Sequence, residues 1–281
     1  MSTTSTLTAT QVEFYHTQGY LLLPSLYSEA EVDQMRALIA NDIASGGWTQ
    51  APYHGEDVTT DIYERIPALA RLVLSQSYLY AMRDLFGPDT VVLAEPAVHR
   101  GRYYYWHKDS TFLDEQGEDF HWQDDFAAAM TVLYLQGNDP THGGGLTVVP
   151  RTQRDPDFYH RIPTMSTMER LFLKAQKLFQ SSHFDRLERH PDLLPIPSKK
   201  GDLLVIDMRL DHRGTPALRP PPAEKYGIMN IACTGQETAD RLSQALRRRP
   251  SGYYQDYLAK EPETTPILQA LETKYGVPLQ L

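Results

Sequence analysis

Short apolar runs separated by Gly- and Pro-containing turns recur along most of this chain. The runs are rich in Leu, Val and Ile, a composition that favours buried strands. Many short strands framed by amphipathic helices are typical of an antiparallel double-sheet barrel. We therefore expect a mainly β fold with flanking helices, a double-stranded β-helix of the jelly-roll or cupin-like kind. The runs are Tyr20–Pro24, Thr90–Ala94, Met130–Leu135, Leu146–Pro150, Leu203–Met208 and Lys225–Ala232.

Helical signals lie at both ends of the chain and interrupt the strands. Thr8-x-x-Gln11 and Ser28-x-x-Glu31 have the capping-box pattern that opens a helix. Apolar residues recur at helical spacing over Ile66–Phe86, over residues 157–190 and from Gln236 onward. With 281 residues, of which 41% are hydrophobic, the chain can bury a substantial core. We expect one domain over residues 1–281, with helical N- and C-terminal segments and a helical insertion near 157–190.

Composition limits the classes of partner. The net charge is −9 and the pI is about 5.6, whereas binding to nucleic acid needs a basic face. The single cysteine, Cys233, excludes an intramolecular disulfide and any multi-cysteine metal site. Residues 1–10 lack the features of a signal peptide, and no apolar stretch reaches the length of about 18 residues that a membrane span needs. We expect a soluble, cytoplasmic protein without nucleic-acid or membrane partners, and the sequence indicates no oligomeric state.

The aromatic stretch Tyr103–Asp109 is the best candidate for a functional strand. Alternate residues of a strand share a face, so His107 and Asp109 are expected to point the same way. A His-x-Asp pair supplies two ligands of the facial triad that binds non-haem Fe(II), and the triad needs one more His. His212 is the best candidate for it, because it follows the buried strand Leu203–Met208 where that strand gives way to a turn.

This pattern is weak when it stands alone. The chain has 10 His and 36 Asp plus Glu residues, so a His-x-Asp pair arises easily by chance. Taken singly, each residue fits a structural role as well as it fits a role as metal ligand. His107 could be a core histidine, Asp109 a strand-end cap and His212 a turn histidine. His121 is a rival ligand, but it lies in an acidic insertion, and a flexible loop holds a ligand less precisely than a strand does. We therefore expect His121 at the surface or in contact with substrate.

Two irregular segments complete the sequence pattern. Residues 46–62 show no sustained period and contain Trp48 and Tyr53, so the segment is either a lid over a pocket or a plain loop. Gly143-Gly144-Gly145 lies between two predicted strands, which favours a tight connection with positive φ. A phosphate-binding loop is disfavoured there, because no helix follows the glycines.

Taken together, these motifs resemble the phytanoyl-CoA dioxygenase-like family of Fe(II)- and 2-oxoglutarate-dependent oxygenases. No single motif is decisive, but their order and spacing match the family over most of the chain. The matching segments are Gln18–Pro24 with the helix that follows it, Trp106–Asp109, Gly144–Pro150, Gly201–Asp207 and His212–Pro216.

The resemblance implies a set of ligands and cofactors. His107, Asp109 and His212 would ligate Fe(II), 2-oxoglutarate would chelate the iron through its keto and C1 carboxylate oxygens, and O2 would be the second co-substrate. The family also places a basic residue, normally Arg, shortly after the second His to pair with the far carboxylate of 2-oxoglutarate.

The chain departs from the family at that basic residue. The position that family spacing selects is Ala223, and the residue that leads directly into the next strand is Lys225. We expect Lys225 to anchor 2-oxoglutarate, with Arg219 as the alternative and Thr131 as a secondary hydrogen-bond donor. Lys offers a point charge where Arg offers a bidentate fork, so this contact would differ from that of the family.

The resemblance implies a dioxygenase that hydroxylates, desaturates or cyclises a small organic substrate, and secondary metabolism is one setting in which such enzymes act. Halogenases of this kind replace the carboxylate of the triad with a small residue, so Asp109 favours the other outcomes. Tyr103 and Tyr105 on the ligand face suggest a small, partly apolar guest. Two alternatives are a non-catalytic metal-binding barrel, suggested by the missing arginine, and a cupin-like isomerase or hydrolase with Zn(II) or Mn(II) in the same ligands.

Overall fold

The structure is a computed structural model, and it describes residues 6–48, 51–53, 56–59, 62–94, 98–101, 105–155, 185–248 and 265–280. Most of the predicted helical insertion near 157–190 lies outside these residues, as do Tyr103 and Tyr104. The helices are α1 (Ala9–Gln18), α2 (Glu29–Ala44), α3 (Ile62–Arg65), α4 (Pro67–Val73), α5 (Gln76–Phe86), α6 (Thr111–Glu115), the 3-10 helix η1 (Phe120–Trp122), α8 (Gln236–Arg247) and α10 (Pro266–Tyr275). The strands are β1 (Tyr20–Leu23), β2 (Ala51–Tyr53), β3 (Glu56–Thr59), β4 (Thr90–Leu93), β5 (Val98–Gly101), β6 (Ala128–Tyr134), β7 (Leu146–Val148), β8 (Leu194–Pro195), β9 (Leu203–Asp207), β10 (His212–Gly214), β11 (Tyr226–Thr234) and β12 (Leu279–Gln280).

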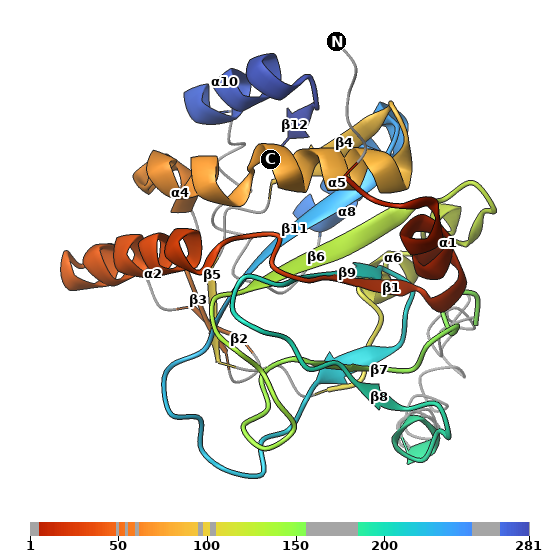
Figure 1. Cartoon of the computed structure of the whole chain (residues 1–281). Helices are drawn as coiled ribbons and strands as arrows, with labels where there is room; N and C mark the ends of the chain where they lie inside the picture. The colour runs from red at the N-terminus through yellow and green to blue at the C-terminus, as the bar shows by residue number, and fades with distance from the viewer. Residues whose placement is uncertain are drawn as a thin grey trace, which may run out of the picture.

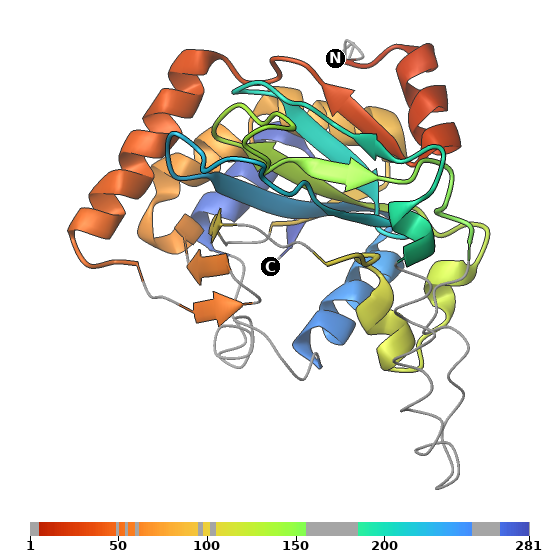
Figure 2. The same cartoon turned by 90° about the horizontal axis from the view of Figure 1, so that it is seen from below.

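Two sheets form the framework. The larger has nine strands with the order β1-β9-β6-β11-β5-β3-β2, in which β4 also pairs with β11 and β12 pairs with β4. The smaller has the order β10-β7-β8. Figures 1 and 2 show the small sheet against one side of the large sheet, while α4 and α5 lie on its other side. Among the described residues, all strand pairs except the parallel β12–β4 pair are antiparallel, and the predicted double-sheet barrel with flanking helices is confirmed.

Alternation along β6 separates the two faces of the large sheet. Ala129 and Leu133 pack in the cluster that the helices cover. Val132 and Tyr134 pack instead with Val148 of the small sheet, in a cluster between the two sheets. Odd positions of β6 therefore face the helices, and even positions face the interior of the barrel.

The predicted helix starts are confirmed, but one helix is divided. Thr8 and Ser28 both form capping boxes, and the N–H of Gly19 donates to the carbonyl of Tyr15 at the end of α1. The pattern over Ile66–Phe86 predicts one helix, whereas the structure has α4 and α5. The break occurs because the extended residue Ser75 uses its side chain to accept the N–H of Tyr78 and so starts a new helix.

The segment 46–62 is more regular than the sequence predicts. Its described parts include β2 and β3, and β3 pairs with β5 at the edge of the large sheet. Backbone pairing with β5 explains these short strands, although the sequence there has no apolar alternation. Among the helices in the described part of the chain, none combines the length and the apolarity needed to cross a bilayer.

Candidate active site

His107 and His212 meet across one antiparallel bridge at the edge of the small sheet. Each histidine donates its backbone N–H to the carbonyl of the other at 3.0 Å. The predicted strand through Asp109 is not formed, because Asp109 already lies in the turn that precedes α6. Tyr105 was expected on the ligand face, but the residue is 61% exposed. The turn nevertheless returns the carboxylate of Asp109 to the two imidazoles.

Three side chains converge at this bridge. Oδ1 of Asp109 lies 3.7 Å from Nε2 of His107 and 3.7 Å from Nε2 of His212. Within the described residues, this is the group of His, Cys, Asp and Glu side chains close enough to share a metal ion, with ligand atoms within 4.8 Å of one another. Two metal–ligand bonds of about 2.1 Å together span about 4.2 Å, so one ion can reach across the 3.7 Å separations.

The backbone fixes the tautomer of both imidazoles. Nδ1 of His107 lies 2.9 Å from the carbonyl oxygen of Tyr105, and Nδ1 of His212 lies 2.9 Å from that of Leu210. A carbonyl oxygen only accepts, so Nδ1 carries the proton and Nε2 keeps its lone pair for a metal. Burial, and then the neighbouring His107, lower the pKa of His212 to about 4. His212 is therefore neutral near pH 7, and the donor set fits the two-histidine, one-carboxylate site of non-haem iron.

Lys225 is buried at the entrance to β11. Lys225 lies two residues before Gly227, so both positions are on the same face of the sheet. Gly227 faces Tyr134 and Val132 of the barrel interior. Its ammonium lies 3.2 Å from Oδ1 of Asn138 and 3.4 Å from the carbonyl oxygen of Gly137, and it also donates to the carbonyl of Gly143. The lysine thus stands on the interior side of the sheet, held by the loop that precedes β7.

The glycine-rich loop is shaped around that lysine. Gly143 and Gly144 have φ values of 61° and 81°, so the predicted positive-φ connection is confirmed. A Cβ atom at Gly144 would overlap the Cδ atom of Lys225. Glycine at this position is therefore required both by the backbone conformation and by the passage of the lysine side chain.

The other two predicted co-substrate residues lie elsewhere. Arg219 is exposed in the loop after β10, where its backbone N–H donates to the carbonyl of Thr141 at 2.9 Å. Thr131 faces the helix layer, since its hydroxyl lies 3.1 Å from Oη of Tyr78 and donates to the carbonyl of Asn230 at 3.0 Å. The structure does not bring Thr131 to the interior face on which Lys225 lies.

The expectation that His121 is a surface or substrate contact is wrong. His121 is fully buried in η1, with its Nε2 3.2 Å from Oδ1 of the equally buried Asp114. Its ring lies beside Phe120 and Phe126, which belong to the core cluster under α8. The aromatic residues interspersed among the acidic ones were the signal that this insertion is folded into the core rather than flexible.

Sequence reasoning assigned no role to the neighbours of the ligands. Trp106 and Arg213 are partners, with the guanidinium carbon 5.3 Å from the indole ring centroid. Glu188 joins them, because its carboxylate accepts from both Nε1 of Trp106 and Nη2 of Arg213 at 2.9 Å. Lys108 donates to Oδ2 of Asp211 at 3.0 Å. Such pairs require the strand register, which the sequence alone does not provide.

Comparison with known proteins agrees with this geometry. The sequence matches the phytanoyl-CoA dioxygenase (PhyH) family over residues 15–218, which is more than half of the chain. A comparison with curated proteins found no match.

Solved structures with the same fold include three similar chains. HygX from Streptomyces hygroscopicus, with nickel and 2-oxoglutarate bound, is 18% identical, with a TM-score of 0.58 over 82% of this chain and 88% of that chain. The carbocyclase SnoK from nogalamycin biosynthesis is 17% identical, with a TM-score of 0.57 over 87% and 94%. EctD from S. alaskensis, with 2-oxoglutarate and 5-hydroxyectoine, is 17% identical, with a TM-score of 0.56 over 85% and 79%. From the match over residues 15–218, the chain belongs to the phytanoyl-CoA dioxygenase family of non-haem iron and 2-oxoglutarate-dependent oxygenases.

Proposed function

We propose that this chain catalyses the O2- and 2-oxoglutarate-dependent oxidation of a small organic molecule, with His107, Asp109 and His212 as the iron ligands. The observation that carries the proposal is the convergence of two Nε2 atoms on Oδ1 of Asp109 at 3.7 Å, with both Nδ1 atoms fixed by backbone carbonyls. When bound, Fe(II) with 2-oxoglutarate and O2 supplies the oxidant that attacks a C–H bond, and succinate and CO2 are released.

The protein contributes orientation and charge. The carbonyls of Tyr105 and Leu210 hold the imidazoles in the tautomer that leaves Nε2 available. Asp109 supplies the anionic ligand, and its presence favours hydroxylation, desaturation or ring formation over halogenation, which needs room for a halide at this position.

Lys225 is the proposed anchor for the far carboxylate of 2-oxoglutarate. Three observations support this role for Lys225 over the exposed Arg219. Lys225 is buried, it lies on the same face of the sheet as the interior-facing Gly227, and it stands at the start of β11. A carboxylate that reaches the ammonium would compete with the carbonyls of the 137–143 loop for its donors. Thr131 is not included, because its hydroxyl is directed at Tyr78.

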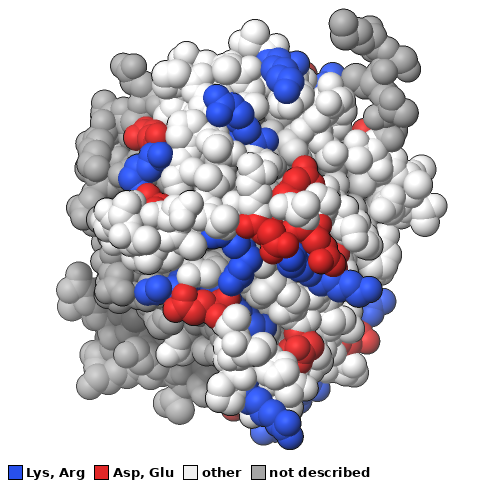
Figure 3. Space-filling model, turned by 60° about the vertical axis from the view of Figure 1, so that its left-hand side comes forward, with Lys and Arg blue, Asp and Glu red and all other residues white. Residues whose placement is uncertain are grey.

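Three solved structures support a small-molecule substrate from secondary metabolism. HygX has been solved with hygromycin B, EctD with 5-hydroxyectoine, and SnoK is a carbocyclase of nogalamycin biosynthesis. Acidic and basic side chains are interspersed on the face shown in Figure 3, which, together with the net charge of −9, supports a partner other than nucleic acid. The proposed cytoplasmic location rests on the single, buried Cys233.

An anaerobic titration tests the proposal. Fe(II) is added to the metal-free protein, then 2-oxoglutarate, and the visible charge-transfer band of the chelate is followed; O2 is then admitted and succinate is measured. We expect the band and a slow release of succinate even without substrate. Iron binding with neither signal would favour a non-catalytic barrel. Selective binding of Zn(II) or Mn(II) without dependence on 2-oxoglutarate would favour a cupin-like isomerase or hydrolase.

A further inference from the structure

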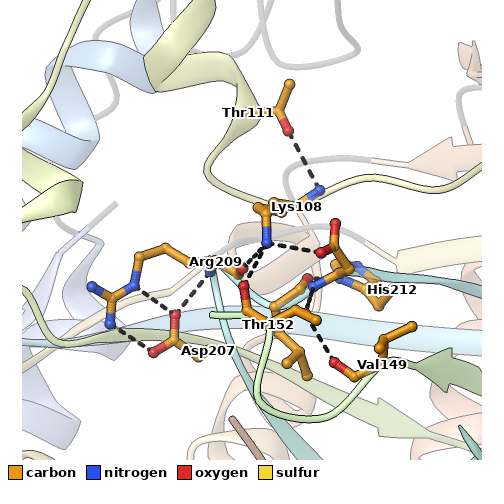
Figure 4. Close-up of polar contacts among 9 residues, drawn as sticks. Lys108, Thr111, Val149, Thr152, Asp207, Arg209 and His212 are labelled. Atoms are coloured by element: carbon orange, nitrogen blue, oxygen red, sulfur yellow. Dashed lines mark hydrogen bonds and ion pairs between the residues drawn. The ribbon is translucent and has the colours of Figure 1, made fainter. Parts of the chain in front are cut away.

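Lys108, between two of the proposed ligands, is a buried lysine. Its side chain is among the largest that are fully buried, with 2% of the residue exposed. A buried ammonium is stable only when it is fully hydrogen-bonded or paired. Its Nζ donates to the carbonyls of Thr152 at 2.8 Å and Arg209 at 2.6 Å, and to Oδ2 of Asp211 at 3.0 Å, as Figure 4 shows for the two carbonyls. Its three donors therefore reach three acceptors.

The register of the His107–His212 bridge explains this partnership. In an antiparallel pair with His107 opposite His212, Lys108 lies opposite Asp211 and Trp106 lies opposite Arg213. Alternation directs these neighbours to the side of the bridge away from the two imidazoles. A buried ion pair on one flank and a cation–π contact on the other thus hold together the two segments that carry the ligands.

Asp211 is itself held firmly. Its N–H donates to Oγ1 of Thr152 at 3.0 Å, and its carbonyl accepts from the N–H of Val149 at 3.0 Å. The hydroxyl of Thr152 in turn donates to the carbonyl of Val149 at 2.9 Å (Figure 4). A closed network therefore runs from Lys108, adjacent to His107 and Asp109, to Asp211, adjacent to His212.

We infer that the Lys108–Asp211 pair is a positioning device that sets the separation of the three ligands and thereby the affinity for the metal. This inference rests on the proposed function. Because the lysine is positively charged, a positioning role and an electrostatic role predict opposite changes in metal affinity when Lys108 is replaced. A positive charge next to the site repels a metal cation, so a purely electrostatic role predicts tighter binding when Lys108 is neutralised. Positioning predicts weaker binding.

The test uses Lys108→Met, Asp211→Asn and the double variant Lys108→Met/Asp211→Asn in the full chain. Each is titrated anaerobically with Fe(II), and with Co(II), whose d–d absorption reports ligand geometry; thermal unfolding of the metal-free protein is measured in parallel. Loss of a residue that orients metal ligands typically weakens metal binding or activity about 10- to 100-fold. We expect a loss of this size in Fe(II) affinity for Lys108→Met, with an altered Co(II) spectrum.

The double variant keeps the inference testable if a single variant folds poorly, because it leaves no unpaired buried charge. We expect it to regain stability relative to the single variants while its Fe(II) affinity stays low. Wild-type affinity in the double variant, or tighter binding by Lys108→Met, would overturn the inference.

Tyr78→Phe is the matched control, since it removes a buried hydrogen bond to Thr131 on the helix-covered face. It should lower the unfolding temperature without changing Fe(II) affinity. An equal loss of Fe(II) affinity in Tyr78→Phe would mean that the effect of Lys108→Met comes from general destabilisation of the fold. Failure of the proposed function looks different, because the wild type itself would then show no chelate band with 2-oxoglutarate.

Discussion

Gly144 and Lys225 occupy the same small space at the start of β11, so that a methyl group on Gly144 would overlap the lysine side chain. The two residues are far apart in the sequence and belong to different parts of the fold, a loop before β7 and the entrance to β11. Their contact links the glycine-rich motif to the proposed co-substrate anchor. The glycines therefore leave room for the side chain of Lys225, and they do not form a phosphate-binding loop.

Gly144→Ala should weaken 2-oxoglutarate binding. A side chain at φ 81° costs roughly 1–2 kcal/mol of backbone strain, and the added methyl group displaces Lys225. The measurement is the 2-oxoglutarate dissociation constant of the Fe(II) protein, read from the chelate band. Gly276→Ala is the control, because Gly276 has φ 65° but an added Cβ would meet no atom within 4 Å. Gly276→Ala should lose stability and keep the wild-type affinity for 2-oxoglutarate. Unchanged 2-oxoglutarate binding in Gly144→Ala would show that the glycine-rich loop does not position Lys225 for the co-substrate.

Lys225→Met should raise the dissociation constant of 2-oxoglutarate by one to two orders of magnitude, since a charged hydrogen bond contributes about 1.5–3 kcal/mol. Methionine keeps most of the apolar stem beside Gly144 and removes the charge. Arg219→Met, at an exposed position, should bind 2-oxoglutarate as the wild type does. The reverse result, with only Arg219→Met impaired, would transfer the anchor to Arg219. Fe(II) affinity, measured first in each variant, should remain unchanged.

The barrel could be predicted from local apolar patterns, whereas the ligand set was predicted from the order and spacing of motifs that resemble a known family. The apolar run Leu203–Met208 predicts a strand, and the structure has β9 there (Leu203–Asp207), with His212 following it in the sequence. β3 was missed because it forms through backbone pairing with β5, which has no side-chain signature. The burial of His121 was missed for a related reason, since only packing against Phe120 and Phe126 turns an acidic insertion into core.

Contacts that depend on register were beyond the sequence. From the sequence, Lys108 is expected to be a solvated lysine. Only the His107–His212 bridge places it opposite Asp211. The sequence favoured Lys225 over Arg219 only because Lys225 leads directly into the next strand. Both are basic residues near the family position, and only the three-dimensional structure distinguishes the buried residue from the exposed one.

The single cysteine should be inert in the folded protein. Cys233 is buried in β11, and burial raises the pKa of its thiol to about 12. The reactive thiolate is therefore scarce near pH 8, and a thiol reagent should modify one group per chain only after denaturation. Because the folded pKa lies above the ordinary value of 9.0, the unfolded chain loses this proton first, so stability should fall as the pH rises from 9 toward 12. Rapid labelling of the native protein at pH 8 would contradict this burial.

Asp109→Ala should abolish Fe(II)-dependent succinate release, because it removes the one oxygen ligand placed 3.7 Å from both imidazoles. The variant keeps His107 and His212 with their Nδ1 atoms on backbone carbonyls, so weak metal binding through two nitrogens should persist. Succinate formation and the Co(II) spectrum are the two measurements, and both should change together. Asp33→Ala is the control, since Asp33 is an exposed carboxylate on α2 whose partner is Lys200. Succinate release by Asp109→Ala at the wild-type rate would exclude this carboxylate from the iron site, whereas loss of activity in both variants would point to an effect on folding.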